Sequence, residues 1–268
     1  MGFKALIDAD ILLFECSAAA ETEEDIKGFD FVKEVFDNKV RDIVAAVGAD
    51  SYTLYITGKG NFRFDIAVTK PYKGNRKAEK PWHYANLREY VLSLPQAVLV
   101  EGMEADDAMS IEQGEDTVIC TRDKDLRMVE GWHYGWESGA QAGFQLQQVD
   151  SFGALSITEG KKKKLRGTGM MFFYSQLLTG DTVDNILGLE RCGPVKAYEL
   201  LHECKTEEEL FKAVQGAYEE KHGDEWRVHM LEMGRLLWMV RELDSEGKPV
   251  LWDIPTMGES DGEQSTED

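Results

Sequence analysis

The sequence predicts an α/β protein with a mostly parallel sheet flanked by helices, followed by an all-helical C-terminal part. Short apolar runs alternate with helical periodicity in the N-terminal part, which is the rhythm of a parallel sheet. The C-terminal part carries only helical periodicity. With 268 residues and 43% hydrophobic content, the chain can bury a core large enough for one domain or a domain with an appendage.

The elements follow from these patterns in chain order. Buried strands are expected at 3–8, 52–57, 97–100 and 116–121, with short further strands at 132–134 and 144–149. Helices are expected at 29–47, 83–93, 170–179, 195–201, 206–219 and 225–243. Pro194 suits the first position of the third-last helix, where its missing N–H is not needed.

Composition excludes several classes of protein. The chain has no apolar run of about 18 residues that would span a membrane. Its N-terminus enters a strand-like run without the apolar region of a signal peptide. The four cysteines are scattered, which favours reduced thiols in the cytoplasm and argues against a zinc site.

The charge is unevenly distributed along the chain. The formal net charge is −20, which taken alone disfavours a nucleic-acid partner. However, residues 59–80 contain seven Lys or Arg against two acids, and 161–166 contain five basic residues in six. The tail at 258–268 has no basic residue and is typical of a disordered segment.

Three acids are crowded into the stretch from Glu104 to Asp107. Residues 104 and 107 share one helix face, and Asp106 lies beside them. Acidic residues at this spacing fit a helix start, where they meet free N–H groups and the positive end of the dipole. They equally fit a site at which a cation neutralises them.

More acids follow at comparable positions of the predicted sheet. Asp8 ends the first strand, and Asp10 would point the same way on an extended chain. Asp123 and Asp125 follow the fourth strand, and the carboxyl ends of parallel strands are where open sheets place ligand chemistry. Each group alone could be a turn or a helix cap. Together they predict one carboxylate cluster.

Two features suit contacts with nucleic acid. Residues 59–80 combine basic side chains with aromatic ones, which fits phosphate contacts plus base stacking, although a solvated basic loop is the simpler alternative. Asp181 and Asp184 are three apart and would share a face on a helical turn. The glycine-bounded turn from Gly188 to Gly193 leaves a helix N-terminus free for a phosphate, or is a plain connection.

Five segments stand together in the order and spacing of a known family. They are Asp8, Arg63 with Tyr72-Lys-Gly-Asn-Arg76, Glu104-Ala-Asp-Asp107, Thr121-Arg-Asp-Lys-Asp125 and Gly180-Asp-x-x-Asp-Asn-Ile-x-Gly188. Through them, residues 3–202 resemble the flap-endonuclease family of 5′→3′ exonucleases, especially its bacteriophage members and the 5′-nuclease domain of bacterial DNA polymerase I. The resemblance implies a PIN-like sheet, a helical arch and a helix–three-turn–helix element.

The resemblance also implies site residues and partners. Metal ligands for two Mg²⁺ or Mn²⁺ ions would be Asp8, Glu104, Asp106, Asp107, Asp123, Asp125, Asp181 and Asp184. Lys73 and Arg76 would meet the scissile phosphate, and the nucleic-acid contacts would be Arg63, Tyr72, Lys73, Arg76, Gly188, Gly193 and Lys196. A potassium ion would assist the glycine-bounded turn. The substrate would be DNA with 5′ ends, flaps or junctions, cleaved to 5′-phosphates by a monomer in the cytoplasm, that of the host if a phage encodes it.

The same resemblance divides the chain. A PIN-like nuclease core would span 1–160 with a basic arch at about 59–90, a helical DNA-binding region 161–255, and an acidic tail 256–268. One departure concerns the end of the second strand, where the family usually has an Asp and this chain has Ile56-Thr57-Gly58. Asp10 would compensate for it. A PIN-type ribonuclease and a non-catalytic DNA-structure binder remain the alternative functions.

Overall fold

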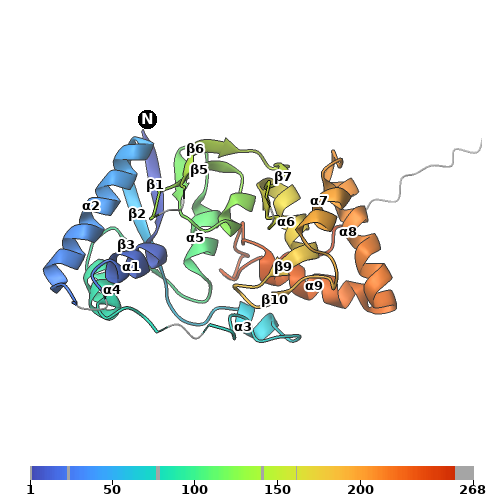
Figure 1. Ribbon diagram of the computed structural model, residues 1–268, viewed down its shortest axis with the longest axis horizontal. Coiled ribbons are helices and arrows are strands. Elements are labelled where there is room, and N and C mark those ends of the chain that lie inside the picture. The colour runs from blue at the N-terminus through green and yellow to red at the C-terminus, as the bar shows by residue number, and fades with distance from the viewer. Residues whose placement is uncertain (1, 23–24, 77–78, 140–141, 161, 257–268) are drawn as a thin grey trace, which may run out of the picture.

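The fold is built around a mostly parallel sheet, which a computed structural model describes over residues 2–22, 25–76, 79–139, 142–160 and 162–256. Its strands are β1 (Phe3–Asp8), β2 (Ala49–Thr57), β3 (Ala97–Val100), β4 (Thr117–Cys120), β5 (Gly131–Gly135) and β6 (Phe144–Val149). They are ordered β3-β2-β1-β4-β5-β6, and only β6 runs antiparallel to its neighbour. The carboxyl ends of β1 to β5 therefore meet at one edge of the sheet (Figure 1).

Helices cover both faces of this sheet. One face packs against α1 (Ala9–Ala18), α2 (Phe29–Val47) and α4 (Tyr84–Leu92). The other packs against α5 (Ala105–Glu112) and the C-terminal helices. Because alternate strand residues point to opposite faces, Ile7 joins the first core and Leu6 the second.

The C-terminal part is mainly helical. Its elements are β7 (Leu155–Ile157), β8 (Leu165–Gly167), α6 (Gly169–Thr179), β9 (Gly180–Asp181), β10 (Ile186–Leu187), α7 (Pro194–Leu201), α8 (Glu207–His222), η2 (Gly223–Glu225) and α9 (Trp226–Leu237). Two short helices, α3 (Arg63–Ile66) and η1 (Asp125–Met128), lie in the N-terminal part. One hydrophobic cluster runs from the sheet through α6 to α9, so this part packs on the sheet.

The predicted fold class is confirmed, and the structure corrects several elements. Helix α1 was not predicted, because residues 9–18 are apolar nearly throughout and show no helical periodicity. The last helix ends at Leu237 instead of 243, because Val240 and Arg241 return to α5 and hydrogen-bond to Asp107 and Ser110. The hairpin β7–β8 was also missed. The division at 160 and the helix–three-turn–helix element stay predictions.

Over the part of the chain that the structure describes, no helix combines the length and the apolar character needed to span a membrane. The predicted acidic tail lies outside the described residues from residue 257 onward.

Candidate metal centre

The first part of the site forms where β1 and β4 end side by side. Asp8 closes β1 and caps α1, accepting a hydrogen bond from the N–H of Ile11 at 3.2 Å. Its other oxygen accepts from the Thr121 hydroxyl at 2.7 Å, just past β4. Asp123 follows in the same loop, and its backbone N–H donates to Thr121 Oγ1 at 3.0 Å. The strand ends thus bring Asp8 and Asp123 to one place, as expected.

The second part is the start of α5. Glu104 is the N-cap, and the side chains of Glu104 and Asp107 form a capping box. Asp106 lies in the first helical turn, and burial followed by the charges of Asp8, Asp123 and Glu104 raises its pKa well above the usual range. The four carboxylates therefore share one electrostatic environment, and the acidic stretch both starts a helix and joins the cluster.

Mutual repulsion extends to neighbouring acids. Burial and then Asp10 raise the pKa of Asp8 to about 7. Burial and then Asp123 raise the pKa of Asp125 to about 7. Such shifts arise where carboxylates are withdrawn from water without enough compensating positive charge.

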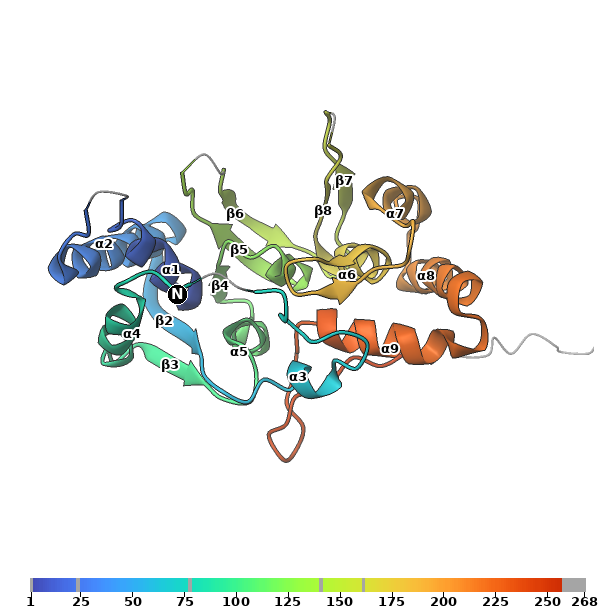
Figure 2. The same cartoon turned by 60° about the horizontal axis from the view of Figure 1, so that its bottom comes forward.

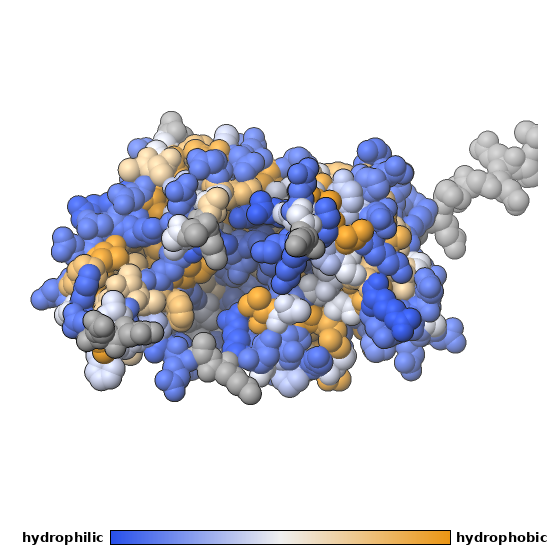
Figure 3. All heavy atoms as spheres, in the orientation of Figure 1, coloured by the Kyte–Doolittle hydropathy of each residue, from blue (hydrophilic) through white to orange (hydrophobic). Residues whose placement is uncertain are grey.

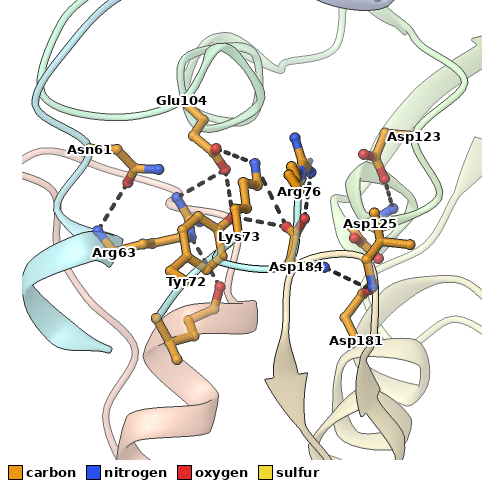
Figure 4. Close-up of polar contacts among 12 residues, drawn as sticks. Asn61, Arg63, Tyr72, Lys73, Arg76, Glu104, Asp123, Asp125, Asp181 and Asp184 are labelled. Atoms are coloured by element: carbon orange, nitrogen blue, oxygen red, sulfur yellow. Dashed lines mark hydrogen bonds and ion pairs between the residues drawn. The ribbon is translucent and has the colours of Figure 1, made fainter. Parts of the chain in front are cut away.

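The acids near the C-terminal part lie on a different structure from the one predicted. Asp181 and Asp184 belong to a tight connection between β9 and β10, not to a helical turn. Asp181 Oδ1 accepts from the N–H of Val183 at 2.7 Å. The two carboxylates diverge, Asp181 toward Asp125 and Asp184 toward Lys73 (Figure 4).

Three basic side chains form ion pairs with Asp181, Asp184 and the acids beside them. The Lys73 ammonium pairs with Glu104 and lies 3.7 Å from Asp184 Oδ2, and Arg76 donates to Asp184 Oδ1 at 2.6 Å. Lys124 bridges Asp125 at 2.7 Å and Asp181 at 2.5 Å. The sequence interpretation missed Lys124, although its place between Asp123 and Asp125 was a usable signal.

The segment around Lys73 is fastened to the β9–β10 connection. The backbone N–H of Lys73 donates to the Asp184 carbonyl at 2.9 Å, and the amide of Asn75 donates to the Thr182 carbonyl at 2.7 Å. Asn185 donates back to the Pro71 carbonyl at 2.9 Å. Lys73 itself has a φ of 53°, a left-handed conformation that surrounding contacts must stabilise. These bonds hold Lys73 and Arg76 beside the acids.

Two predicted contacts prove to be a buried ion pair. Arg63 and Asp107 are both fully buried, and the guanidinium meets the carboxylate at 2.5 and 2.8 Å. Arg63 also donates to the carbonyls of Leu236 and Trp238. The predictions that Arg63 contacts nucleic acid and that Asp107 binds metal are wrong, because each group is enclosed by the other and by the returning chain.

Tyr72 is likewise enclosed. It is 4% exposed, and its hydroxyl lies 2.9 Å from an oxygen of Glu104 and 2.9 Å from an oxygen of Asp184, to either of which it can donate. The predicted stacking role does not fit this conformation, because the Tyr72 side chain is buried and its ring packs against that of Phe64, with ring centres 5.7 Å apart. Tyr72 instead orients the acids that face Lys73.

Asp10 lies at the position of the missing acid. The prediction that Asp8 and Asp10 lie on one extended chain is wrong, because Asp10 lies in the first turn of α1. Its Oδ2 accepts from the N–H of Thr57 at 2.9 Å, so it reaches the end of β2. Thr57 also accepts from the N–H of Ala105 through its hydroxyl, which joins α5 to this strand end.

The glycine-bounded turn stands apart from these contacts. A Cβ on Gly188 would lie 2.2 Å from the carbonyl carbon of Thr179, so close backbone packing requires glycine there. Gly193 is the N-cap of α7, and Lys196 is exposed on the first turn of that helix. Their predicted contacts with nucleic acid stay predictions.

The donor chemistry fits a hard divalent cation, although the groups are not assembled around one. Over the described residues, no three His, Cys, Asp or Glu side chains are placed to hold a metal ion together. Lys73 is paired with Glu104, and Lys124 is paired with Asp125 and Asp181, so these three acids face a cation of the chain. The remaining donors are carboxylate oxygens with raised pKa values, the set that Mg²⁺ or Mn²⁺ neutralises.

Comparison with known proteins supports the fold. No family model and no curated protein matches the sequence. Among solved structures, bacteriophage T5 5′-exonuclease with bound zinc gives a TM-score of 0.52 at 13% identity, covering 89% of this chain and 100% of that one. T5 D15 protein crystallised with metal ions gives 0.51 at 15%, covering 88% and 99%. T5 D15 flap endonuclease with DNA and metal ions gives 0.51 at 13%, covering 87% and 98%.

Proposed function

We propose that this chain, which has the fold of the T5 flap endonuclease, is a metal-dependent 5′→3′ exonuclease and 5′-flap endonuclease that hydrolyses DNA to 5′-phosphate products. The observation that carries the proposal is the meeting of Asp8, Glu104, Asp106 and Asp123 at the carboxyl edge of the sheet. The T5 structures with this fold contain metal ions, and one contains DNA. Reaction and substrate are therefore inferred from site and fold together.

The metal ligands divide into two groups. Asp8, Glu104, Asp106, Asp123 and Asp125 would hold one Mg²⁺ or Mn²⁺ ion, and Asp181 with Asp184 would serve a second. Two such ions supply an activated water and stabilise the leaving oxygen in phosphodiester hydrolysis. Asp107 is left out of this set because Arg63 occupies it.

The chain itself supplies positive charge beside the acids. Lys73 and Arg76 lie next to Asp184, and Arg76 is half-exposed at 52% of its side chain. A phosphate that enters beside Asp184 would meet both cations, which would neutralise charge that develops on its oxygens. Lys73→Ala should slow cleavage equally on every sequence, because phosphate contacts carry no base information. A change in sequence preference would contradict this role.

The second DNA contact is proposed at α7. The exposed N-terminus of that helix, Gly193 and Lys196 would hold the phosphate backbone of the duplex, with K⁺ at the glycine-bounded turn. Lys196→Ala should then weaken duplex binding and leave binding of single strands unchanged. Equal loss on both probes would contradict the assignment.

The experiment that tests the whole proposal is a cleavage time course on a labelled 5′-flap duplex with and without Mg²⁺. Wild type should release short 5′-terminal products only with the metal, and Asp123→Asn should bind the substrate without cutting it. The matched control is Asp42→Asn, which removes an exposed acid from α2. If wild type cuts RNA but not the flap duplex, the chain is a PIN-type ribonuclease. If it binds DNA and cuts neither, it is a non-catalytic binder, the reading that Thr57 at the missing acid favours.

A further inference from the structure

The basic run at 161–166 takes no part in the carboxylate site. Its described residues form part of the hairpin β7–β8, where Lys164 and Arg166 are exposed. The hairpin projects from the body of the molecule between β6 and α7 (Figure 2). In a chain of net charge −20, such a concentration of basic residues needs a physical explanation.

A cleft of about 810 Å³ lies between this hairpin and the start of β6. Its basic lining comes from two separate elements: Arg127 from η1, and Lys164 with Arg166 from the hairpin. Phe144 of β6 and Leu155 of β7 supply apolar surface. The guanidinium of Arg127 lies over the Phe144 ring, 4.2 Å from its centre, and this cation–π contact holds the Arg127 side chain in place.

The cations of this cleft are not paired with carboxylates. Over the described residues, no Asp or Glu lies within ion-pair distance of Arg127, Lys164 or Arg166, whereas the neighbouring Lys124 pairs with two acids. Arg63 likewise has a carboxylate at 2.5 Å. All three cations line the same cleft, so their like charges repel one another. An anion in the cleft would relieve this repulsion.

The cleft begins beside the carboxylate cluster. Arg127 is two residues from Asp125 on the same short helix, η1. The face drawn in Figure 3 is hollowed near its middle, with hydrophilic residues around the hollow. A strand whose phosphate lies at the cluster would therefore have its adjoining phosphates near Arg127.

We propose that the cleft between β6 and the hairpin β7–β8 binds the sugar-phosphate backbone of nucleic acid that extends from the carboxylate cluster, through Arg127, Lys164 and Arg166. This inference rests on the proposed function and adds to it a second binding surface. The cations are spread over η1 and the hairpin instead of converging on one point, which suits a chain of phosphates better than a single anion. Contacts to the phosphate backbone carry no base information, so binding at this cleft should be independent of sequence.

The test is a binding measurement without cleavage. Wild type and the variant Lys164→Gln/Arg166→Gln are titrated in EDTA onto a fluorescent single strand, a blunt duplex and a 5′-flap duplex, each over a range of salt concentration. Both substituted side chains are exposed, so the melting temperature should not change. Two lost phosphate contacts should weaken binding about 10- to 50-fold near 0.1 M salt, and lower the slope of log K against log salt by about two.

The control variant is Arg41→Gln/Arg227→Gln, which removes the same charge from exposed positions on α2 and α9. It should bind as wild type does. Selective loss on the two duplex probes assigns the cleft to the duplex arm, and selective loss on the single strand assigns it to that strand. If the hairpin variant equals the control on all three probes, the inference is wrong. Failure of wild type to cut, with loss of binding by the hairpin variant, would refute the nuclease activity and leave this surface standing.

Discussion

Removing one charge from the carboxylate cluster should stabilise the metal-free protein while it destroys the proposed activity. Asp8→Asn is the sharpest case, because Asp8 is 3% exposed and burial with Asp10 raises its pKa to about 7. Asparagine is also a good N-cap, so the bond from Ile11 is kept. Thr121 can accept from the new amide instead of donating. The substitution therefore changes charge more than packing.

The magnitude follows from the raised pKa. The folded state holds the Asp8 proton up to about pH 7, whereas the unfolded chain releases it near 3.8. The resulting stability is fully present below pH 3.8 and is lost as pH rises through about 7. Above pH 7 the charged side chain costs about 4 kcal/mol, of which the coupled acids recover part. A net gain of about 2–4 kcal/mol for the variant corresponds to a rise in melting temperature of about 5–10 °C.

The assay is thermal denaturation in EDTA from pH 4 to pH 8.5, followed by circular dichroism. The gain of Asp8→Asn over wild type should be largest at pH 8 and shrink steadily toward pH 4. Asp42→Asn, which removes an exposed charge, should track wild type throughout. Mg²⁺ should raise the melting temperature of wild type more than that of Asp8→Asn. A variant no more stable than wild type at pH 8, or a gain independent of pH, would refute the reasoning.

Three further predictions follow from the described contacts. Lys124→Met should tighten Mg²⁺ binding by about two- to fivefold in calorimetry, because the partly exposed ammonium no longer competes for Asp125 and Asp181; unchanged or weaker binding would contradict this. Arg63→Met should lower the free energy of unfolding by about 3–5 kcal/mol, since it strands the Asp107 charge in the core, and Arg63→Met/Asp107→Leu should recover part of the loss in denaturant titrations. Burial lowers the pKa of His133 to about 4, so stability is present above about pH 6.5 and should fall by up to about 3 kcal/mol between pH 6.5 and 4. His133→Gln should remove that part of the pH dependence, and an unaltered profile would count against it.

The sequence predicted the parts of the site that depend on strand ends. Asp8 and Asp123 meet because each stands at or just after the end of a buried strand, and the apolar runs that form those strands can be recognised in the sequence. Glu104 and Asp106 join them because α5 begins at the same edge of the sheet. Local pattern and sheet topology point the same way here, so convergence could be inferred without coordinates.

The errors concern residues whose role depends on contacts distant in sequence. The family resemblance assigned Arg63 to nucleic acid, and its basic neighbourhood suited that role. Nothing local shows that the chain after Leu236 returns to enclose it with Asp107. Tyr72 was misassigned for the same reason, since Asp184 lies 112 residues away in the chain. Helix α1 was missed because helical periodicity appears only when one helix face is polar.

Some acids of the site are paired with cations of the chain and others are not, and this difference should set the order of metal binding. Asp125, Asp181 and Asp184 are paired with Lys124, Lys73 or Arg76, so a metal there must first displace a cation of the chain. For Asp8, Asp106 and Asp123, no Lys or Arg of the described residues lies within ion-pair distance, and all three have raised pKa values. A divalent ion therefore gains more electrostatic free energy beside Asp8, Asp106 and Asp123, and the ion that they hold should bind first. Lys73 and Lys124 keep the paired acids together until a metal, or a phosphate that draws Lys73 away, replaces them.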